Sequence, residues 1–357
     1  MHPIYYINLA IPFILGLYAR FSQLDKKTQN KFILIAYSLF AVLVIGTRTL
    51  DTGTDTTSYY RFYDVALYSD DNSRIINYFE PLFSLIGLVS ARLGLSFVEF
   101  NILIAALTMI FFSLAVGKSC SNVTMSIFLC TSFSLFVQMM NQVRQGLAMM
   151  VILYAVTFLK EDKIKKFLFW ILIAGLIHTS SFAAILLVFV YKIEINKKAI
   201  LLYAITGILG MIFSRIFFAI IIRYTIYGHL LTETYRGYSA FDNATIVNTI
   251  FRFFLLVMVL IYYKDINKTS MQINVYYHMA MICMVLQLIA IMNNAIARIT
   301  TIFFTSYLII IPNVFEKSDR LKSNWQITYP AVIGFFLIYY FGYSYMKGFF
   351  YYNSVLS

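Results

Sequence analysis

A polar motif interrupts a long apolar run of the chain at residues 141–145, which read Asn-Gln-Val-Arg-Gln. A charged residue at membrane depth costs ~2.5–3.5 kcal/mol or more, so it usually faces a cavity or a partner. Arg144 is therefore a candidate for binding an anion, with Gln145 as a second candidate beside it. The alternative is that Arg144 lies at a helix end and extends to lipid phosphates, as long basic side chains often do.

Other arginines lie within or beside apolar segments and raise the same question. They are Arg48, Arg215, Arg223, Arg252 and Arg298. The guanidinium group offers a planar fork of donors that matches two phosphate oxygens. Several such groups near one face of a membrane protein favour an anionic ligand, such as a phosphate or a pyrophosphate, over a neutral one.

The longest polar stretch of the chain, residues 48–80, mixes carboxylates, hydroxyls, guanidinium groups and aromatic rings. This mixture suits sugar hydroxyls and phosphate, and its carboxylates could accept a hydroxyl proton or coordinate a divalent ion. The candidate ligand-binding residues here are Asp51, Asp55, Tyr59 and Glu80. A solvated external loop with local ion pairs would have the same composition.

His178 lies inside an apolar run beside the small hydroxyl residues Thr179, Ser180 and Ser181. An imidazole can exchange a proton near neutral pH or bind phosphate. A lone histidine in a membrane segment is also often a structural hydrogen-bond donor. The sequence contains no glycine-rich phosphate loop, zinc pattern or nucleophile elbow, so we predict no metal and no cofactor.

The composition indicates which elements position these residues. The 357-residue chain is 61% hydrophobic and 12% charged, with a mean hydropathy of +0.77, whereas soluble domains lie nearer half apolar and a quarter charged. This balance excludes a water-soluble enzyme, a disordered chain and a nucleic-acid-binding module. Long uninterrupted apolar stretches favour helices over the short alternating strands of a barrel. We therefore predict an all-α polytopic integral membrane protein.

We expect about 11–12 transmembrane helices, since a span needs ~20 apolar residues. They form one domain, residues 1–357, because no internal repeat and no Pro/Gly/Ser-rich linker divides the chain. The apolar segments lie at about 3–19, 32–47, 79–93, 97–117, 123–142, 145–159, 167–191, 199–222, 247–263, 272–292, 299–314 and 326–346. The polar stretches 48–78 and 223–246 are predicted to be external, periplasmic-side loops.

Lysines and arginines divide between two sets of loops. The lysine-rich loops lie at 26–31, 160–166, 192–198, 264–268 and 317–322. The positive-inside rule places these loops in the cytoplasm, and the net charge of +12 reflects this bias. Loops on the same side of the membrane must be separated by an even number of crossings. The apolar segments between these loops meet that condition only if 79–93 is re-entrant and 167–191 breaks near His178 into two half-helices. Such irregular backbone is tolerated where it lines a cavity in the protein.

The predicted loop 223–246 is rich in tyrosine and also contains His229, Arg236 and Asp242. Aromatic faces stack on the C–H surfaces of sugars, so this loop suits carbohydrate binding. With 28 tyrosines in the chain, an aromatic belt at the membrane interface is an equal alternative.

Three motifs, in order within residues 48–181, resemble those of the EpsG-like family. The first comprises Arg48, Thr52 to Thr56 and Tyr59 to Phe62, the second is Asn141 to Ala148, and the third runs from Ile173 to Ser180. Gly146 departs from the second motif, where we expect a larger residue.

The resemblance implies a Wzy-type polysaccharide polymerase with a GT-C-like fold, in the cytoplasmic (inner) membrane of a bacterium. Such an enzyme transfers a growing glycan from undecaprenyl pyrophosphate to a sugar hydroxyl of a new lipid-linked repeat unit at the outer face. The product would be an O-antigen, a capsule or an exopolysaccharide. We expect a metal-independent glycosyltransferase in which arginines stabilise the leaving pyrophosphate. Arg144 and Arg298 are the first candidates, and Arg48, Arg223 and Arg252 the second.

The general base remains open in this interpretation. His178 would bind the pyrophosphate or orient the acceptor hydroxyl, and the carboxylate of Asp55 is the alternative base. The expected partners are an undecaprenyl-pyrophosphate-linked oligosaccharide and membrane lipid. The resemblance implies a chain-length regulator and a flippase as further partners. We expect no nucleic-acid partner.

Two other functions fit the same features. A lipid-linked oligosaccharide flippase or transporter also has many spans and internal arginines, but it more often shows two repeated halves, which we do not find in the sequence. An O-antigen ligase-like glycosyltransferase would use the same lipid donor on the same side of the membrane.

Overall fold

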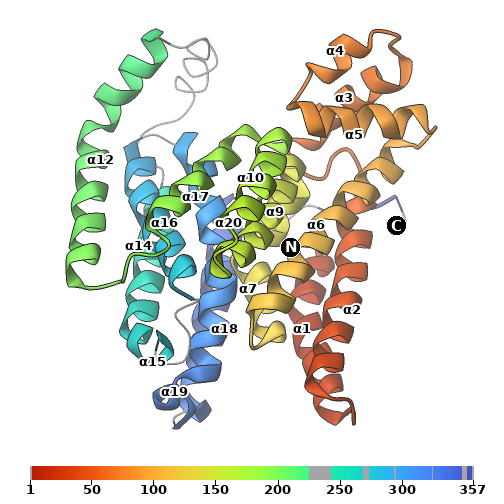
Figure 1. The fold of residues 1–357 in the computed structure, drawn as a ribbon. Coiled ribbons are helices and arrows are strands. Elements are labelled where there is room, and N and C mark those ends of the chain that lie inside the picture. The colour runs from red at the N-terminus through yellow and green to blue at the C-terminus, as the bar shows by residue number, and fades with distance from the viewer. Residues whose placement is uncertain are drawn as a thin grey trace.

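The computed structural model describes residues 2–224, 243–267, 273–292, 295–323, 325–347 and 352–355. This part of the chain is helical, apart from connecting segments and an isolated antiparallel bridge between Arg48 and Ser354. In Figure 1 the long helices stand side by side, and three shorter helices, α3 (Thr56–Tyr68), α4 (Asn72–Ile76) and α5 (Pro81–Arg92), gather at one end of the bundle.

Within the described residues, nine helices are long and apolar enough to cross a membrane. They are α1 (Pro3–Phe21), α2 (Lys26–Gly46), α6 (Phe97–Ser119), α9 (Val143–Lys160), α12 (Lys197–Tyr224), α14 (Asn243–Ile261), α16 (Asn274–Met292), the continuous pair α17 (Ala295–Phe304) and α18 (Tyr307–Lys317), and α20 (Trp325–Lys347). The pair α7 (Val123–Ser132) and α8 (Leu135–Asn141) is also long and apolar enough when taken together, but it bends by 62°. The bend lies at Ser134, whose φ of 58° is in the left-handed region. The protein is an all-α multi-pass membrane protein.

Two apolar segments contain no helix long enough to span, and they are the two that the loop charges singled out. One is α5 (Pro81–Arg92), and the other is α10 (Ile164–Ile177) with the 3-10 helix η1 (Thr179–Leu186) and α11 (Leu187–Val190). Proline fits the first turn of a helix and opens α5, whereas His178 has an extended backbone that ends α10. The described part therefore has fewer full spans than the sequence predicted.

The predicted external loop 48–78 is largely helical, which corrects that expectation. It contains α3 (Thr56–Tyr68) and α4 (Asn72–Ile76). Apolar side chains recur along α3 at helical spacing, and those of Tyr59, Phe62 and Tyr63 are buried against α5 and α6. This region is therefore a small helical cap on the bundle rather than a solvated loop.

Several of the lysine-rich loops lie at the end of the molecule opposite this cap. Figure 1 places α15 (Tyr263–Asn267) and α19 (Asp319–Ser323) at that end. There, Lys26 pairs with Glu316 at 3.2 Å, and Ser318 donates to Asp265 at 3.2 Å. Three of the loops assigned to the cytoplasm by their charge therefore share one end of the fold.

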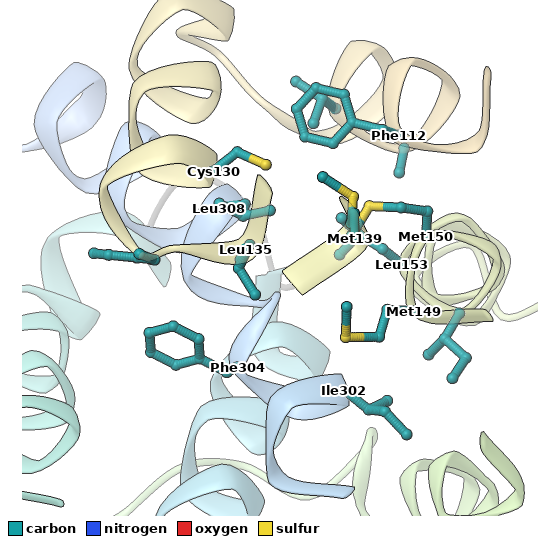
Figure 2. Packing of buried hydrophobic residues seen from close by; sticks show 14 of the residues in the cluster. Phe112, Cys130, Leu135, Met139, Met149, Met150, Leu153, Ile302, Phe304 and Leu308 are labelled. Atoms are coloured by element: carbon teal, nitrogen blue, oxygen red, sulfur yellow. The ribbon is translucent and has the colours of Figure 1, made fainter. Parts of the chain in front are cut away.

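The core between α7, α8, α9 and the α17–α18 pair is filled by methionine, leucine and phenylalanine side chains (Figure 2). Gly146 lies where α8 and α9 touch, because a Cβ there would come within 2.9 Å of the Cα of Met139. The departure from the family pattern at Gly146 thus has a steric reason, and it places the start of α9 close against α8.

Candidate active site

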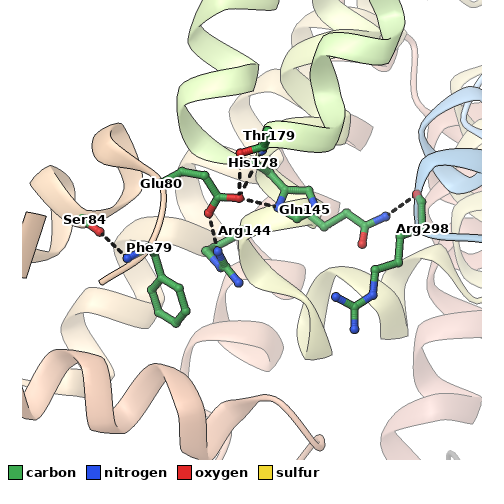
Figure 3. Close-up of polar contacts among 8 residues, drawn as sticks. All are labelled: Phe79, Glu80, Ser84, Arg144, Gln145, His178, Thr179 and Arg298. Atoms are coloured by element: carbon green, nitrogen blue, oxygen red, sulfur yellow. Dashed lines mark hydrogen bonds and ion pairs between the residues drawn. The ribbon is translucent and has the colours of Figure 1, made fainter. Parts of the chain in front are cut away.

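Glu80 joins two candidate residues that are far apart in the sequence. Its Oε2 pairs with Nη1 of Arg144, and its Oε1 lies 3.1 Å from Nδ1 of His178. The backbone N–H of Thr179 also donates to Oε1, at 3.1 Å. Figure 3 shows the four residues converging on the one carboxylate. We call Glu80, Arg144, His178 and Thr179 the Glu80 network.

Each side chain of this network stands at a break in a helix. Glu80 directly precedes α5, Arg144 is the second residue of α9, and His178 separates α10 from η1. Helix ends leave backbone N–H groups without intrahelical partners, which is why the N–H of Thr179 is available to Glu80. The apolar helix bodies pack together and bring their polar ends to one place.

The network favours the ionised form of Glu80, whose side chain is 15% exposed. Burial by itself raises the pKa of this carboxyl. The hydrogen bond from His178, the charge of Arg144 and the N–H of Thr179 outweigh burial and lower the pKa to about 2. Glu80 is therefore a carboxylate at neutral pH and serves as the counterion of Arg144.

Aromatic rings orient the guanidinium of Arg144. Its central carbon lies 3.9 Å from the centroid of the Phe79 ring and 5.8 Å from that of Tyr59, within the range of cation–π attraction. The Arg144 side chain is 21% exposed, and its Nε has no hydrogen-bond partner. The guanidinium is thus held in place while it keeps N–H donors for another acceptor.

The contact with Glu80 determines which nitrogen of His178 can accept a proton. An ionised carboxylate is only an acceptor, so the Nδ1 facing it must carry the hydrogen. In the neutral ring the lone pair then lies on Nε2, which is buried and has no partner. A ring oriented in this way can accept a proton from, or hydrogen-bond to, a group that approaches Nε2.

The first family motif reaches the same region through Asn141. The backbone N–H of Asp55 donates to Oδ1 of Asn141 at 3.1 Å, and Nδ2 of Asn141 donates to Oγ1 of Thr54 at 3.2 Å. Gly53, which precedes Thr54, has a φ of 87°, and a Cβ there would lie 2.7 Å from the Asn141 amide oxygen. The backbone of Asp55 therefore lies beside Asn141, at the junction of α8 and α9. Asn141 is three residues before Arg144.

Gln145 and Arg298 connect α9 to α17. The side-chain amide of Gln145 is buried and donates to the backbone oxygen of Arg298 at 2.7 Å. The guanidinium of Arg298 is exposed and has no hydrogen bond or ion pair with the described residues. In Figure 3 the guanidinium groups of Arg144 and Arg298 both lie below the Gln145 amide, so the two first-choice arginines flank one connection.

Other candidate residues lie away from the Glu80 network. Arg48 is 1% exposed, and its guanidinium donates to the Ile45 oxygen at 2.5 Å and to Oγ1 of Thr56 at 3.3 Å. It supports the cap from inside the fold rather than facing a surface. Arg252 lies midway along α14 and donates to Oε1 of Gln287 at 2.6 Å. Asp51 is exposed and accepts from Asn353 at 3.2 Å.

Part of the predicted outer surface falls outside the described residues. The side chains of Arg215 and Arg223 lie outside them, and so do residues 225–242 of the expected loop 223–246. The described residues contain no group of three or more His, Cys, Asp or Glu side chains placed to hold a metal ion.

Sequence reasoning did not count the residues that support the network among the candidate site residues. Phe79 stacks on Arg144, Asn141 anchors the Asp55 backbone, and Thr179 supplies a backbone donor. Each is a direct or near neighbour in sequence of a residue that had been singled out. Adjacency was thus the available signal, but only the fold shows which neighbours face the site.

One family model, described as the EpsG family, matches residues 30–354. No curated protein and no solved structure matches the chain. The match covers nearly the whole chain and includes all three motifs and the complete Glu80 network. The chain belongs to the EpsG family.

Proposed function

We propose that this protein is a Wzy-type polysaccharide polymerase. It transfers a growing glycan from undecaprenyl pyrophosphate to a sugar hydroxyl of a new lipid-linked repeat unit, at the outer face of the bacterial cytoplasmic membrane. Family membership supports a polymerase-like role. The observation that carries the proposal is the Glu80 network, which puts a cation, a carboxylate and an imidazole together at the end opposite the lysine-rich loops.

The arginines act on the leaving group. As the bond between the anomeric carbon and the pyrophosphate oxygen breaks, the electron pair leaves with the pyrophosphate, whose negative charge grows. Preorganised cations aimed at this oxygen stabilise the transition state without further reorganisation. Arg144, fixed by Glu80 and Phe79, and Arg298, whose guanidinium has no partner among the described residues, are the groups we assign to this role. We propose that they act without a metal ion.

The reaction also needs a base that takes the proton of the acceptor hydroxyl. Its oxygen forms the new bond to the anomeric carbon and gives up its proton. We assign this proton to Nε2 of His178, because Glu80 fixes the tautomer that leaves Nε2 as the acceptor. Asp55 is the alternative base, and its backbone N–H is bonded to Asn141, the last residue of α8.

The decisive experiment is the glycan pattern of a deletion strain complemented with wild type, Arg144→Ala, His178→Ala or Lys165→Ala. Lys165 lies at the lysine-rich end and serves as the matched control. We expect Arg144→Ala and His178→Ala to lose the long ladder but keep one repeat unit on its acceptor, while Lys165→Ala behaves as wild type. Loss of every repeat, including the first, would indicate a flippase or a ligase, and a normal ladder in either active-site variant would contradict the proposal.

A further inference from the structure

A short segment far along the chain is hydrogen-bonded to the loop that carries the first family motif. We call residues 352–355 the strap and residues 47–55 the motif loop. Thr49 N–H donates to the Asn353 oxygen at 3.0 Å, and Val355 N–H donates to the Thr47 oxygen at 2.8 Å. Figure 1 marks this end of the chain beside the end of α2. The strap therefore pairs with the motif loop like a short strand.

Thr52 is the side chain that fastens the strap. Its hydroxyl accepts from the Asn353 N–H at 2.8 Å and donates to the Asn353 oxygen at 3.1 Å. Thr52 is fully buried, so no water replaces these bonds if they are lost. The Tyr352 hydroxyl adds a further attachment, to the Val44 oxygen of α2 at 2.9 Å.

The motif loop passes this restraint on to the candidate active site. Beyond Thr52, the loop turns at Gly53 and meets Asn141 through Thr54 and Asp55. Asn141 ends α8, one turn before Arg144 on α9. Loops without such backbone bonds open easily, whereas this one is held from both sides.

We infer that the strap is a positioning element for the reaction: by fastening Thr52 it holds the motif loop against the α8–α9 junction and so sets where Asp55 and Arg144 lie. This inference rests on the proposed polymerase function. The strap holds the loop throughout turnover and does not need to detach. Thr52 is a positioning residue and touches no substrate.

The first test compares Thr52→Val with Thr52→Ser. Valine keeps the shape of threonine but loses both bonds to Asn353, whereas serine keeps the hydroxyl. We expect Thr52→Val to make on the order of tenfold less long polymer at a normal protein level, since small displacements of reacting groups cost at least this much. Thr52→Ser should match wild type. Hydrogen exchange should rise within residues 47–55 of Thr52→Val, and a wild-type ladder in this variant would overturn the inference.

A cross-link gives an answer even if Thr52→Val does not fold. The hydroxyl oxygens of Thr47 and Ser354 lie 2.9 Å apart, a separation that suits a disulfide in the double variant Thr47→Cys/Ser354→Cys. Bond formation is checked by counting thiols that react with a maleimide before and after reduction. The inference predicts a full ladder in the oxidised protein, and an inactive oxidised protein overturns it.

The same gel separates this inference from the proposed function. If Arg144→Ala retains polymer, the polymerase proposal fails. If Arg144→Ala loses polymer while Thr52→Val keeps it, only the role of the strap fails.

Discussion

Two arginines of this chain, Arg144 and Arg252, have similar aromatic neighbours but different partners. Each guanidinium lies over a phenylalanine, Phe79 at 3.9 Å and Phe304 at 4.5 Å, and each has an Nε without a partner. Arg144 is paired with the carboxylate of Glu80, which also holds His178. Arg252 is paired with the neutral amide of Gln287, which in turn donates to Thr249 at 2.9 Å.

The different partners indicate different roles: Arg144 lies in a site that can do chemistry, whereas Arg252 connects helices. The partner of Arg144 is charged and shared with an imidazole, and the side chain is partly exposed. Arg252, on α14, contacts Gln287 of α16 and Phe304 of α17, and the residue is 7% exposed. An arginine in an apolar run is thus a weak signal by itself, and its partner decides what it does.

The largest expected effect is the contrast in polymer formation between the two arginines. Arg144→Ala should lower polymer by about 100-fold or more, because the cation aimed at the leaving group is lost. Arg252→Leu should leave the ladder close to wild type wherever the protein accumulates. Densitometry of the ladders, normalised to protein level, measures both, and equal losses in the two variants would remove the distinction.

A double variant tests whether Arg144 and His178 act as one unit. Residues of a catalytic unit are strongly non-additive. We therefore expect Arg144→Ala/His178→Ala to be little worse than Arg144→Ala alone in the same ladder assay. Losses that multiply would mean that the two side chains act independently.

A third prediction concerns the stability of the Arg252–Gln287 pair. Arg252→Leu leaves the Oε1 of Gln287 buried without a donor, at a cost of ~1–3 kcal/mol. The double variant Arg252→Leu/Gln287→Leu should recover part of this loss, because both polar partners are then removed. Thermal unfolding of the purified protein in detergent measures the effect. A double variant less stable than the single one would argue against a structural pair.

The smallest expected effect is the pH dependence of the stability that ionised Glu80 contributes. Its pKa is lowered to about 2 in the folded protein, whereas an ordinary glutamate has a pKa of about 4.3. Its stabilising contribution is therefore complete above the ordinary pKa and is lost as the pH falls towards 2. The advantage in unfolding temperature of wild type over Glu80→Gln should therefore shrink as the pH falls below the ordinary pKa of glutamate. The corresponding difference for Arg252→Leu should not follow this course, since Gln287 does not titrate.

The sequence predicted the membrane class and most of the spans, because composition and apolar segment length determine them. It also indicated Arg144, His178 and Glu80 as separate candidates. It did not show that Glu80 joins them, since these contacts span 64 and 98 residues along the chain. It ranked Arg48 and Arg252 below Arg144, but it did not show that they are held by internal partners, because an internal hydrogen-bond partner leaves no local pattern. The helix α3 was readable from its buried Tyr59, Phe62 and Tyr63, yet the polar residues around them favoured a loop.

The central claim is that the carboxylate of Glu80 organises a polymerase active site, and Glu80→Gln tests it most directly. Glutamine keeps the size of the side chain but removes the charge that pairs with Arg144 and fixes the His178 tautomer. In the complemented deletion strain, we predict loss of the long glycan ladder, with a single repeat unit still attached to its acceptor and the protein present at its normal level. A wild-type ladder from Glu80→Gln would contradict the account.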